Sequence, residues 1–391
     1  MKTYNVPEIA TDVFWVGVKD WNRRMFDALI PLPQGTTYNS YLVKGKDKTV
    51  LIDTANPGFE KELHAKIAQI TDIAKLDFVV MNHAEPDHAG SIPYVMQAAP
   101  KALLVTTEKG AKMAQIYYKV PDDRIRKVKE GDRIELGGKT LEFIDAPWLH
   151  WPETMFTYIV EDKVLFSCDF FGAHTAFGTY EDDVPELMTF AKRYFGEIMM
   201  PFRSAGSKAL QKVKARDVKV IAPSHGPIHR NPAKIIEAYG KWTAGQTERK
   251  AIVVYVSMWN STETMIKAMV ETLLSEGVEV CLHNLTIADI GDIARDLVDS
   301  SAIVLGTPTV LAGMHPLAIY ASHLVKALRP PTKYAVILSS FGWGGGALKQ
   351  AAEILGPTGL EVLGAVEVNG PPADQEFQKI AELGKALAAK M

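Results

Sequence analysis

Cysteine is scarce in this sequence, which has 391 residues but only two cysteines, Cys168 and Cys281. The two lie far apart in apparent strands, as is typical of buried structural thiols. Because no Cys-x-x-Cys pair occurs, the chain itself supplies neither an iron–sulfur centre nor a fused rubredoxin-type module. Any electrons that the protein uses must therefore come from a donor outside this chain.

Long apolar runs and concentrated charge are also missing. No uncharged apolar run is long enough to span a bilayer, and the first residues lack the apolar core of a signal sequence. The net charge is −3 and no basic tract occurs, so nothing favours binding to nucleic acid. We therefore expect a cytoplasmic protein that binds neither membranes nor nucleic acid.

The composition that is present is that of an ordinary globular protein, with 47% hydrophobic and 23% charged residues. The length allows two domains with separate cores. A polar stretch at 243–250 separates two regions whose patterns differ. We therefore expect two domains, at 1–248 and 249–391.

The most informative stretch is His-Ala-Glu-Pro-Asp-His at 83–88. It follows an apolar run at 76–81 that predicts a buried strand, and it precedes a turn and helix start at which Ser91 is a candidate N-cap. The stretch is thus expected at the carboxyl end of a strand, where open α/β folds usually place their chemistry.

Four side chains of this stretch belong to residue types that commonly bind metals. On an extended loop alternate residues point the same way, so His83, Glu85 and Asp87 can converge, and His88 can turn inward where the loop bends. Two imidazoles and two carboxylates exceed the needs of one metal. The mixture of nitrogen and oxygen donors suits iron or manganese better than a structural zinc site, which favours cysteine.

Three further candidate ligands follow, each at the end of an apparent strand: His150, Asp169 and His225. His174 and His229 lie near them and are expected, at most, to orient the ligands by hydrogen bonds. A histidine at a strand end is more often a surface or capped residue, and we assign three others to that class. These are His64, His283 and His323.

Taken together, the pattern resembles the metallo-β-lactamase superfamily, whose hydrolases carry His-x-His-x-Asp-His, a later His, a bridging Asp and a final His. Glu85 stands where those hydrolases have their second His. That replacement is the mark of the flavodiiron proteins, and the resemblance covers about the first two thirds of the chain. It implies an αββα sandwich that holds two irons.

The resemblance also implies how the ligands divide. One iron would be bound by His83, Glu85 and His150, the other by Asp87, His88 and His225, with Asp169 bridging them. His88 is a ligand in some members of the family and is displaced in others. Three carboxylates balance much of the charge of two ferrous or ferric ions, whereas a zinc hydrolase has no such redox requirement.

The second region alternates strands and helices regularly, which predicts a doubly wound parallel sheet of five strands. The expected strands are 251–257, 278–282, 302–306, 334–339 and 361–367, and the expected helices are 262–275, 287–298, 315–328, 346–354 and 373–389.

Three loops at the carboxyl edge of this sheet carry hydroxyl, amide, glycine and tryptophan residues. The first, 257–263, opens a helix and predicts a phosphate cradle without Lys or Arg, although a plain polar turn fits that loop alone equally well. The others are 306–310 and 339–346. This half resembles a flavodoxin, which implies FMN contacts by Ser257, Met258, Trp259, Asn260, Ser261, Thr262, Thr307, Pro308, Thr309, Ser340, Phe341, Gly342, Trp343 and Gly344.

As a flavodiiron protein, the chain would reduce dioxygen to water, nitric oxide to nitrous oxide, or both. FMN would relay electrons from rubredoxin or a reduced deazaflavin, in a head-to-tail homodimer or a tetramer. Two other classes stay open at this point: a zinc hydrolase fused to a flavodoxin module, and an electron carrier that uses FMN alone. One departure is that Asp27 stands where many relatives have a histidine near the irons.

Overall fold

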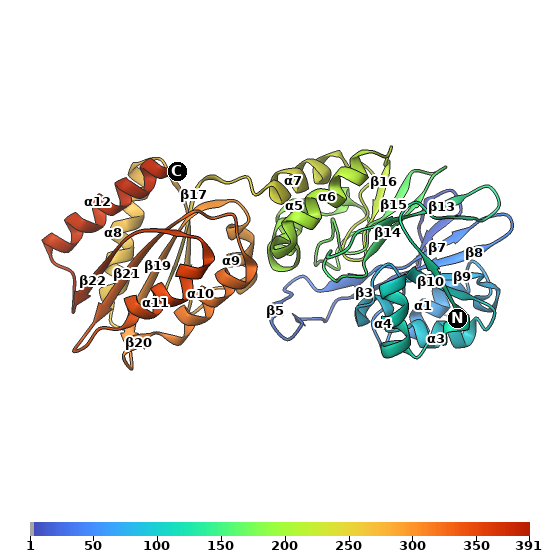
Figure 1. The fold of residues 1–391 in the computed structure, drawn as a ribbon, viewed down its shortest axis with the longest axis horizontal. Coiled ribbons are helices and arrows are strands. Elements are labelled where there is room, and N and C mark those ends of the chain that lie inside the picture. The colour runs from blue at the N-terminus through green and yellow to red at the C-terminus, as the bar shows by residue number, and fades with distance from the viewer. Residues whose placement is uncertain (1–3) are drawn as a thin grey trace. The chain divides into compact units, whose positions relative to one another are not determined.

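The computed structural model describes residues 4–391, which form two compact units (Figure 1). One unit comprises the chain up to Phe195 together with Phe202–Thr243, and the other comprises Gly196–Pro201 together with Ala244–Met391. The chain thus passes from one unit to the other slightly before the boundary expected at 248/249. Among the described helices, none combines the length and the apolar character that crossing a membrane requires.

The first unit contains two mixed sheets. The larger has the order β1 (Glu8–Ala10), β2 (Val13–Trp15), β7 (Tyr41–Lys44), β8 (Thr49–Ile52), β9 (Phe78–Val80), β10 (Leu103–Thr107) and β11 (Ile125–Val128). The smaller has the order β12 (Arg133–Glu135), β13 (Thr140–Asp145), β14 (Met155–Ile159), β15 (Val164–Phe166) and β16 (Val220–Ala222). Two short antiparallel pairs complete the unit: β3 (Val18–Asp20) with β6 (Thr36–Tyr38), and β4 (Met25–Phe26) with β5 (Ile30–Pro31).

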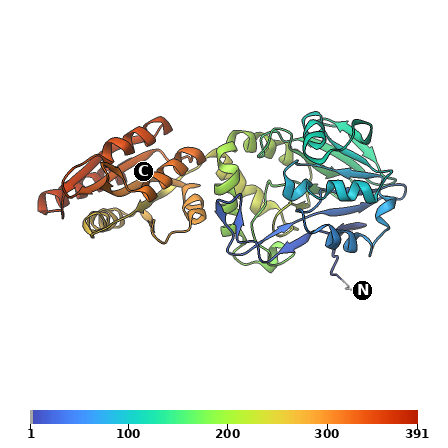
Figure 2. The same cartoon turned by 90° about the horizontal axis from the view of Figure 1, so that it is seen from below.

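Helices cover the outer face of each sheet. Figure 1 shows α1 (Glu60–Ile67), α3 (Ile92–Ala98) and α4 (Glu108–Tyr118) on one side of the sheets. On the other side lie α5 (Leu187–Tyr194), α6 (Arg203–Lys214) and α7 (Ala233–Ala244). In Figure 2 the layer of α1, α3 and α4 faces the viewer. This is the expected αββα sandwich, and the prediction of that fold is confirmed.

The alternation of side chains along each strand explains the two cores. On β8, Val50 and Ile52 enter the core between the two sheets, whereas Leu51 enters the core under α1 and α3. The central strands of the larger sheet, β7 to β10, are buried on both faces, so their sequences read as nearly continuous apolar runs.

The second unit is a five-stranded parallel sheet. The order is β18 (Glu279–Asn284), β17 (Glu248–Tyr255), β19 (Ser300–Val310), β21 (Tyr334–Phe341) and β22 (Glu361–Asn369), with β20 (Gly313–Met314) antiparallel to β19. In chain order this is 2-1-3-4-5, the doubly wound order of flavodoxins. Its helices are α8 (Ser261–Ser275), α9 (Ile290–Leu297), α10 (Pro316–Leu328), α11 (Ala347–Leu355) and α12 (Asp374–Lys390).

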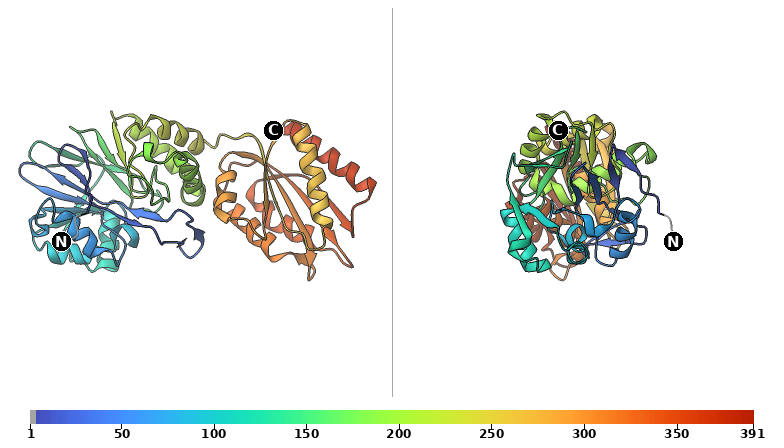
Figure 3. Two further views of the ribbon diagram at one scale, coloured as in Figure 1. Left: turned by 180° about the vertical axis from the view of Figure 1, so that it is seen from behind. Right: turned by 90° about the vertical axis from the view of Figure 1, so that its right-hand side faces the viewer.

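Every strand and helix expected in this unit is present, so the predicted flavodoxin-like sheet is confirmed. Helices α8 and α12 pack on one face of the sheet, through Met265, Met269 and Ile380 among others, and α9 to α11 lie on the opposite face (Figure 3, left). The face under α8 and α12 is lined by Val253, Val304 and other small apolar residues of the strands.

A partly buried network of polar contacts joins strand and helix in this unit. His283, which we expected to be a surface or capped residue, places Nε2 at 2.9 Å from Asp296, and Arg295 donates to both oxygens of the same carboxylate. Burial alone would raise the pKa of Asp296, but these partners lower it overall below its usual range.

We expect Asp296→Asn to destabilise this unit by about 1.5–3 kcal/mol at pH 7, the range for hydrogen bonds to a charged group. Because the folded pKa lies below the unfolded one, the stabilisation is complete above about pH 4 and is lost as the pH falls further. The difference in urea unfolding between wild type and variant should therefore be largest at pH 7 and shrink as the pH falls below about 4, closing only once the pH has fallen through the folded pKa. A difference that persists unchanged at pH 3 would contradict this assignment.

Candidate metal centre and cofactor loops

The stretch at 83–88 is only partly extended. Glu85 has extended backbone angles, and Pro86 then occupies the first position of a short helix, α2 (Pro86–Ala89). Asp87 and His88 therefore point from a helical turn rather than from the extended loop that we expected. Ser91 precedes α3, but its hydroxyl donates to the carbonyl of Ala55 and does not cap the helix, so that expectation was wrong.

The helical turn divides the motif into two groups. In the first, Nε2 of His83 lies 3.1 Å from Oε2 of Glu85, and Nε2 of His150 lies 2.9 Å from the same oxygen. Both nitrogens also face Oδ2 of Asp169, at 3.5 and 3.6 Å. Four donor atoms thus converge from three separate segments of the chain.

The second group faces the other oxygen of Asp169. Nε2 of His88 lies 3.0 Å from Oδ1 of Asp169 and 3.3 Å from Oδ1 of Asp87. Nε2 of His225 lies 3.1 Å from Oδ2 of Asp87 and 3.5 Å from Oδ1 of Asp169. Asp169 therefore presents one oxygen to each group, which is the arrangement of a carboxylate that bridges two ions.

The spacing of these atoms fits metal ions. With metal–ligand bonds of about 2.1 Å, neighbouring ligand atoms stand roughly 3.0–3.5 Å apart. Both oxygens of Asp87 and of Asp169, and both ring nitrogens of His88, are buried and have no hydrogen-bond partner among the described residues. Such groups are costly to bury without compensation, and two cations at the shared centre would supply it.

Outer contacts fix the ligand rings. Nδ1 of His83 donates to Oε1 of Glu153 at 2.7 Å, and Nδ1 of His225 donates to the carbonyl of Thr37 at 2.6 Å. These bonds leave Nε2 of each ring free to face the centre. Glu153 was missed in the sequence, where its only signal is its place three residues after His150.

His174 does not join either group. Its ring centroid lies 4.8 Å from that of His225, and its Nδ1 lies 2.9 Å from the hydroxyl of Thr36. This supports its expected place beside the ligands. Cys168 is buried next to Asp169, and burial raises the pKa of its thiol well above the usual value. Cys281 is only partly buried.

Asp27 lies at the turn between β4 and β5, on backbone with φ of 50°. Partial burial, followed by the negative charges of Glu85 and Asp87, raises the pKa of its carboxyl. The preceding residue, Phe26, contacts the ring of His174 at a centroid distance of 5.0 Å. The departure seen in the sequence therefore places a carboxyl group, not an imidazole, within the electrostatic reach of the metal-facing carboxylates.

The first loop of the second unit leads directly into a helix N-terminus. Asn260 adopts left-handed backbone with φ of 67°, and α8 begins at the next residue. The hydroxyl of Ser257 accepts a hydrogen bond from the backbone N–H of Glu263 at 3.2 Å, and the hydroxyl of Thr262 lies 2.9 Å from that of Ser340. The first and third loops are therefore in contact.

The second loop lies beside the third. Thr307, Pro308 and Thr309 belong to β19, which runs further than we expected, and Pro308 pairs in register with Ser340. Three candidate contact residues are strongly exposed for apolar side chains: Met258 at 51%, Trp259 at 86% and Trp343 at 90%. Large exposed aromatic residues at one sheet edge indicate a binding surface. Among the described residues, no atom lies close to the Cα positions of Gly342 and Gly344 on the side where a side chain would stand, so a ligand could approach the backbone closely there.

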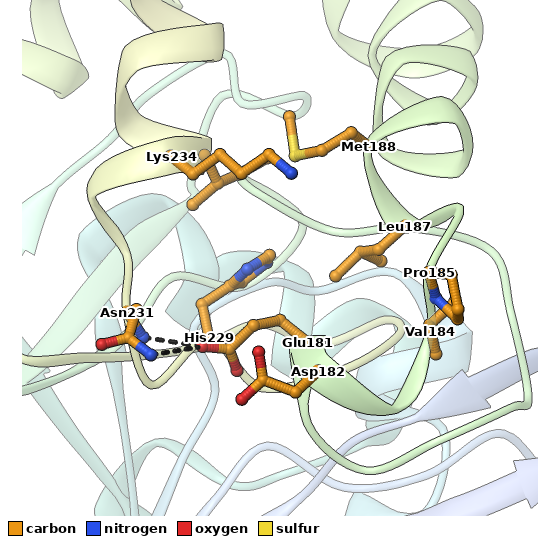
Figure 4. A pocket seen from close by; sticks show the side chains of 10 residues that line it. Glu181, Asp182, Val184, Pro185, Leu187, Met188, His229, Asn231 and Lys234 are labelled. Atoms are coloured by element: carbon orange, nitrogen blue, oxygen red, sulfur yellow. Dashed lines mark hydrogen bonds between the residues drawn. The ribbon is translucent and has the colours of Figure 1, made fainter.

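A cavity of about 430 Å³ lies elsewhere in the first unit, between the segments at 181–188 and 229–235 (Figure 4). Asn231 donates to Glu181 at its rim, and Lys234 and Met188 lie opposite. None of its lining residues is a candidate ligand of the metals or of a flavin. We therefore assign the chemistry to the buried cluster around Asp169.

An αββα sandwich with a buried cluster of possible metal ligands, continued by a flavodoxin-type sheet, is the architecture of a class of flavin-dependent metalloproteins. The family model described as "ODP family beta lactamase" matches residues 36–226. The chain is 38% identical to the nitric oxide reductase of Moorella thermoacetica, over 98% of this chain and 99% of the relative. It is 35% identical to a coenzyme F420H(2) oxidase of Methanocaldococcus jannaschii, over 98% of this chain and 96% of the relative.

Two solved structures are similar over the full length. The flavodiiron protein of Giardia intestinalis superposes with a TM-score of 0.95 at 31% identity, covering 100% of this chain and 97% of the other. The rubredoxin oxygen:oxidoreductase of Desulfovibrio gigas gives a TM-score of 0.95 at 30% identity, covering 99% and 98%. The chain belongs to the flavodiiron protein family. It is an oxidoreductase.

Proposed function

We propose that this protein reduces dioxygen to water, nitric oxide to nitrous oxide, or both, at a pair of non-haem irons. Dioxygen takes up four electrons and four protons to give two waters, whereas two nitric oxides take up two electrons and two protons to give nitrous oxide and water. The observation that supports this most is the convergence of seven nitrogen and oxygen donors in two groups around Asp169.

The chain's residues would divide the work between the two units. His83, Glu85 and His150 would hold one iron, and Asp87, His88 and His225 the other, with Asp169 bridging them. The loops at 257–262, 307–309 and 340–344 would bind FMN, which takes an electron pair and passes electrons on singly. Residues 1–248 would thus be the diiron domain and 249–391 the FMN-binding domain.

The electron donor and the assembly belong to the same proposal. Relatives are named for rubredoxin and for coenzyme F420H(2), so a rubredoxin-type protein or a reduced deazaflavin is the proposed donor. We propose a head-to-tail homodimer, alone or within a tetramer. Electron transfer requires a short distance, and this arrangement would bring the FMN of one subunit close to the diiron site of the other. A cytoplasmic location stays a prediction from the sequence.

A zinc hydrolase is disfavoured. Glu85 replaces the neutral imidazole of the hydrolase motif, which adds a negative charge that suits a centre able to become ferric. Relatives that match over the full length include a nitric oxide reductase, a coenzyme F420H(2) oxidase and a rubredoxin oxygen:oxidoreductase. An electron carrier without a metal site is disfavoured too, because it would leave the buried oxygens of Asp87 and Asp169 without a hydrogen-bond partner among the described residues.

The proposal is tested by turnover with each gas. We expect anaerobically reduced holoprotein, given a continuous supply of donor electrons, to consume dioxygen or nitric oxide catalytically, with flavin and iron both reoxidised. Rates measured separately with the two gases give the preference. Protein that holds only zinc and hydrolyses thioesters or lactams, with no consumption of either gas, would contradict the proposal.

A further inference from the structure

Glu153 lies in the loop between β13 and β14, and its side chain is fully buried. Its Oε1 accepts hydrogen bonds from Nδ1 of His83 at 2.7 Å and from the backbone N–H of Ala84 at 2.8 Å. A carboxylate that accepts from a ligand histidine fixes the orientation of the ring and makes its other nitrogen a stronger donor to a metal. One ligand of the first metal position, His83, is therefore in contact with an additional negative charge.

The second position has no such contact. Nδ1 of His225 donates to the carbonyl of Thr37, which is neutral, and Nδ1 of His88 has no hydrogen-bond partner within residues 4–391. Each position otherwise has two imidazoles, one carboxylate of its own and one oxygen of Asp169. Among the outer contacts of the ligand rings, the carboxylate of Glu153 is thus what distinguishes the two positions.

We propose that Glu153 is a positioning residue that makes the two irons inequivalent, so that the iron on the His83 side is oxidised first. The inference rests on the proposed diiron function. Together with Glu85, Asp87 and Asp169, Glu153 brings the negative charge to four, which balances two ferrous ions. When a one-electron oxidant such as ferricyanide removes one electron, the single added positive charge is most stable beside the extra carboxylate.

Asp53 provides a matched control. It is also a buried carboxylate close to the motif, but its two oxygens accept from the backbone N–H and the side-chain amide of Asn82, at 2.8 and 2.9 Å. It therefore acts on the ligand histidines only through space. Asn suits its left-handed backbone, with φ of 52°, so Asp53→Asn removes a comparable charge without breaking a bond to a ligand.

The test is an anaerobic potentiometric titration of iron-loaded, FMN-containing protein, in which the EPR signal of the mixed-valent state is measured at each potential. In Glu153→Gln the amide oxygen can still accept from His83, while Oε2, which has no hydrogen-bond partner among the described residues, becomes the amide nitrogen. We expect the lower couple, between the diferrous and mixed-valent states, to rise. A tenfold change in the ratio of ferric to ferrous binding corresponds to about 59 mV.

The potential of the upper couple, between the mixed-valent and diferric states, should shift less than half as far in Glu153→Gln. Asp53→Asn should shift the potential of the lower couple less than Glu153→Gln does. If Glu153→Gln does not hold two irons, Glu153→Asp decides, because it draws the carboxylate back and should raise the lower couple by a smaller amount. A lower couple unmoved by either Glu153 variant, or a larger shift of the upper couple, overturns the inference. Wild-type protein unable to hold two irons would instead contradict the proposed function.

Discussion

Replacement of Asp169 by Ala is expected to remove the activity with dioxygen and nitric oxide almost completely. The side chain presents one oxygen to each group of ligands, so its loss weakens both metal positions at once. Metal ions in a catalytic site supply several kcal/mol of charge stabilisation in the transition state, and about 4 kcal/mol corresponds to about a thousandfold in rate. We expect turnover to fall by at least that factor and bound iron to fall from two ions per chain to one or none.

Asp217→Ala is the matched control for this variant. Asp217 lies at the surface of the same unit, where it pairs with Lys163 and Lys219. The control should retain two irons and full turnover. FMN content measured in both variants shows whether the second unit is intact. An Asp169→Ala protein that still consumes either gas at the wild-type rate would show that the bridging assignment is wrong.

Replacement of Ser261 by Asp is expected to weaken FMN binding strongly. Ser261 is the first residue of α8, where the partial positive charge of the helix N-terminus and the free backbone N–H groups favour a phosphate. A carboxylate there would repel the phosphate by about 3 kcal/mol at a separation of about 5 Å, which weakens FMN binding about a hundredfold. The measurement is the dissociation constant of FMN by flavin fluorescence.

The same charge at the far end of the helix serves as the control. Ser275 is exposed at the last position of α8, so Ser275→Asp adds a carboxylate to the same element but away from the loop. We expect FMN affinity within about twofold of wild type for this variant. Equal weakening in both variants would point to a general loss of stability, and no weakening in Ser261→Asp would place the phosphate elsewhere.

The fold of the second unit was largely predictable from the sequence. Its strands are apolar runs, its helices carry apolar stripes, and each loop begins where a run ends, so periodicity determines the element order. The extent of β19 was not predictable, since the pairing of Pro308 with Ser340 and of Thr309 with Met314 depends on neighbouring strands. Tertiary pairing thus extended a strand through residues that we had assigned to a loop.

In the first unit, the residue types of the metal cluster were predictable but their directions were not. The turn imposed by Pro86 sends Asp87 and His88 to the second group, and Asp169 lies three residues beyond the end of β15, after Cys168 with φ of 49°. Glu153 could not be assigned because its contact with His83 joins segments 70 residues apart. A sequence pattern indicates which residues can bind a metal, whereas the packing of the fold determines which other groups lie next to them.

The most direct test of the account is anomalous diffraction from crystals of the iron-loaded protein, collected on both sides of the iron absorption edge. The account predicts two iron peaks about 3.5–4 Å apart, one on each side of the Asp169 carboxylate, with His83 and His225 at opposite ends. A single peak, peaks at the zinc edge alone, or ligand side chains turned away from one another would contradict it.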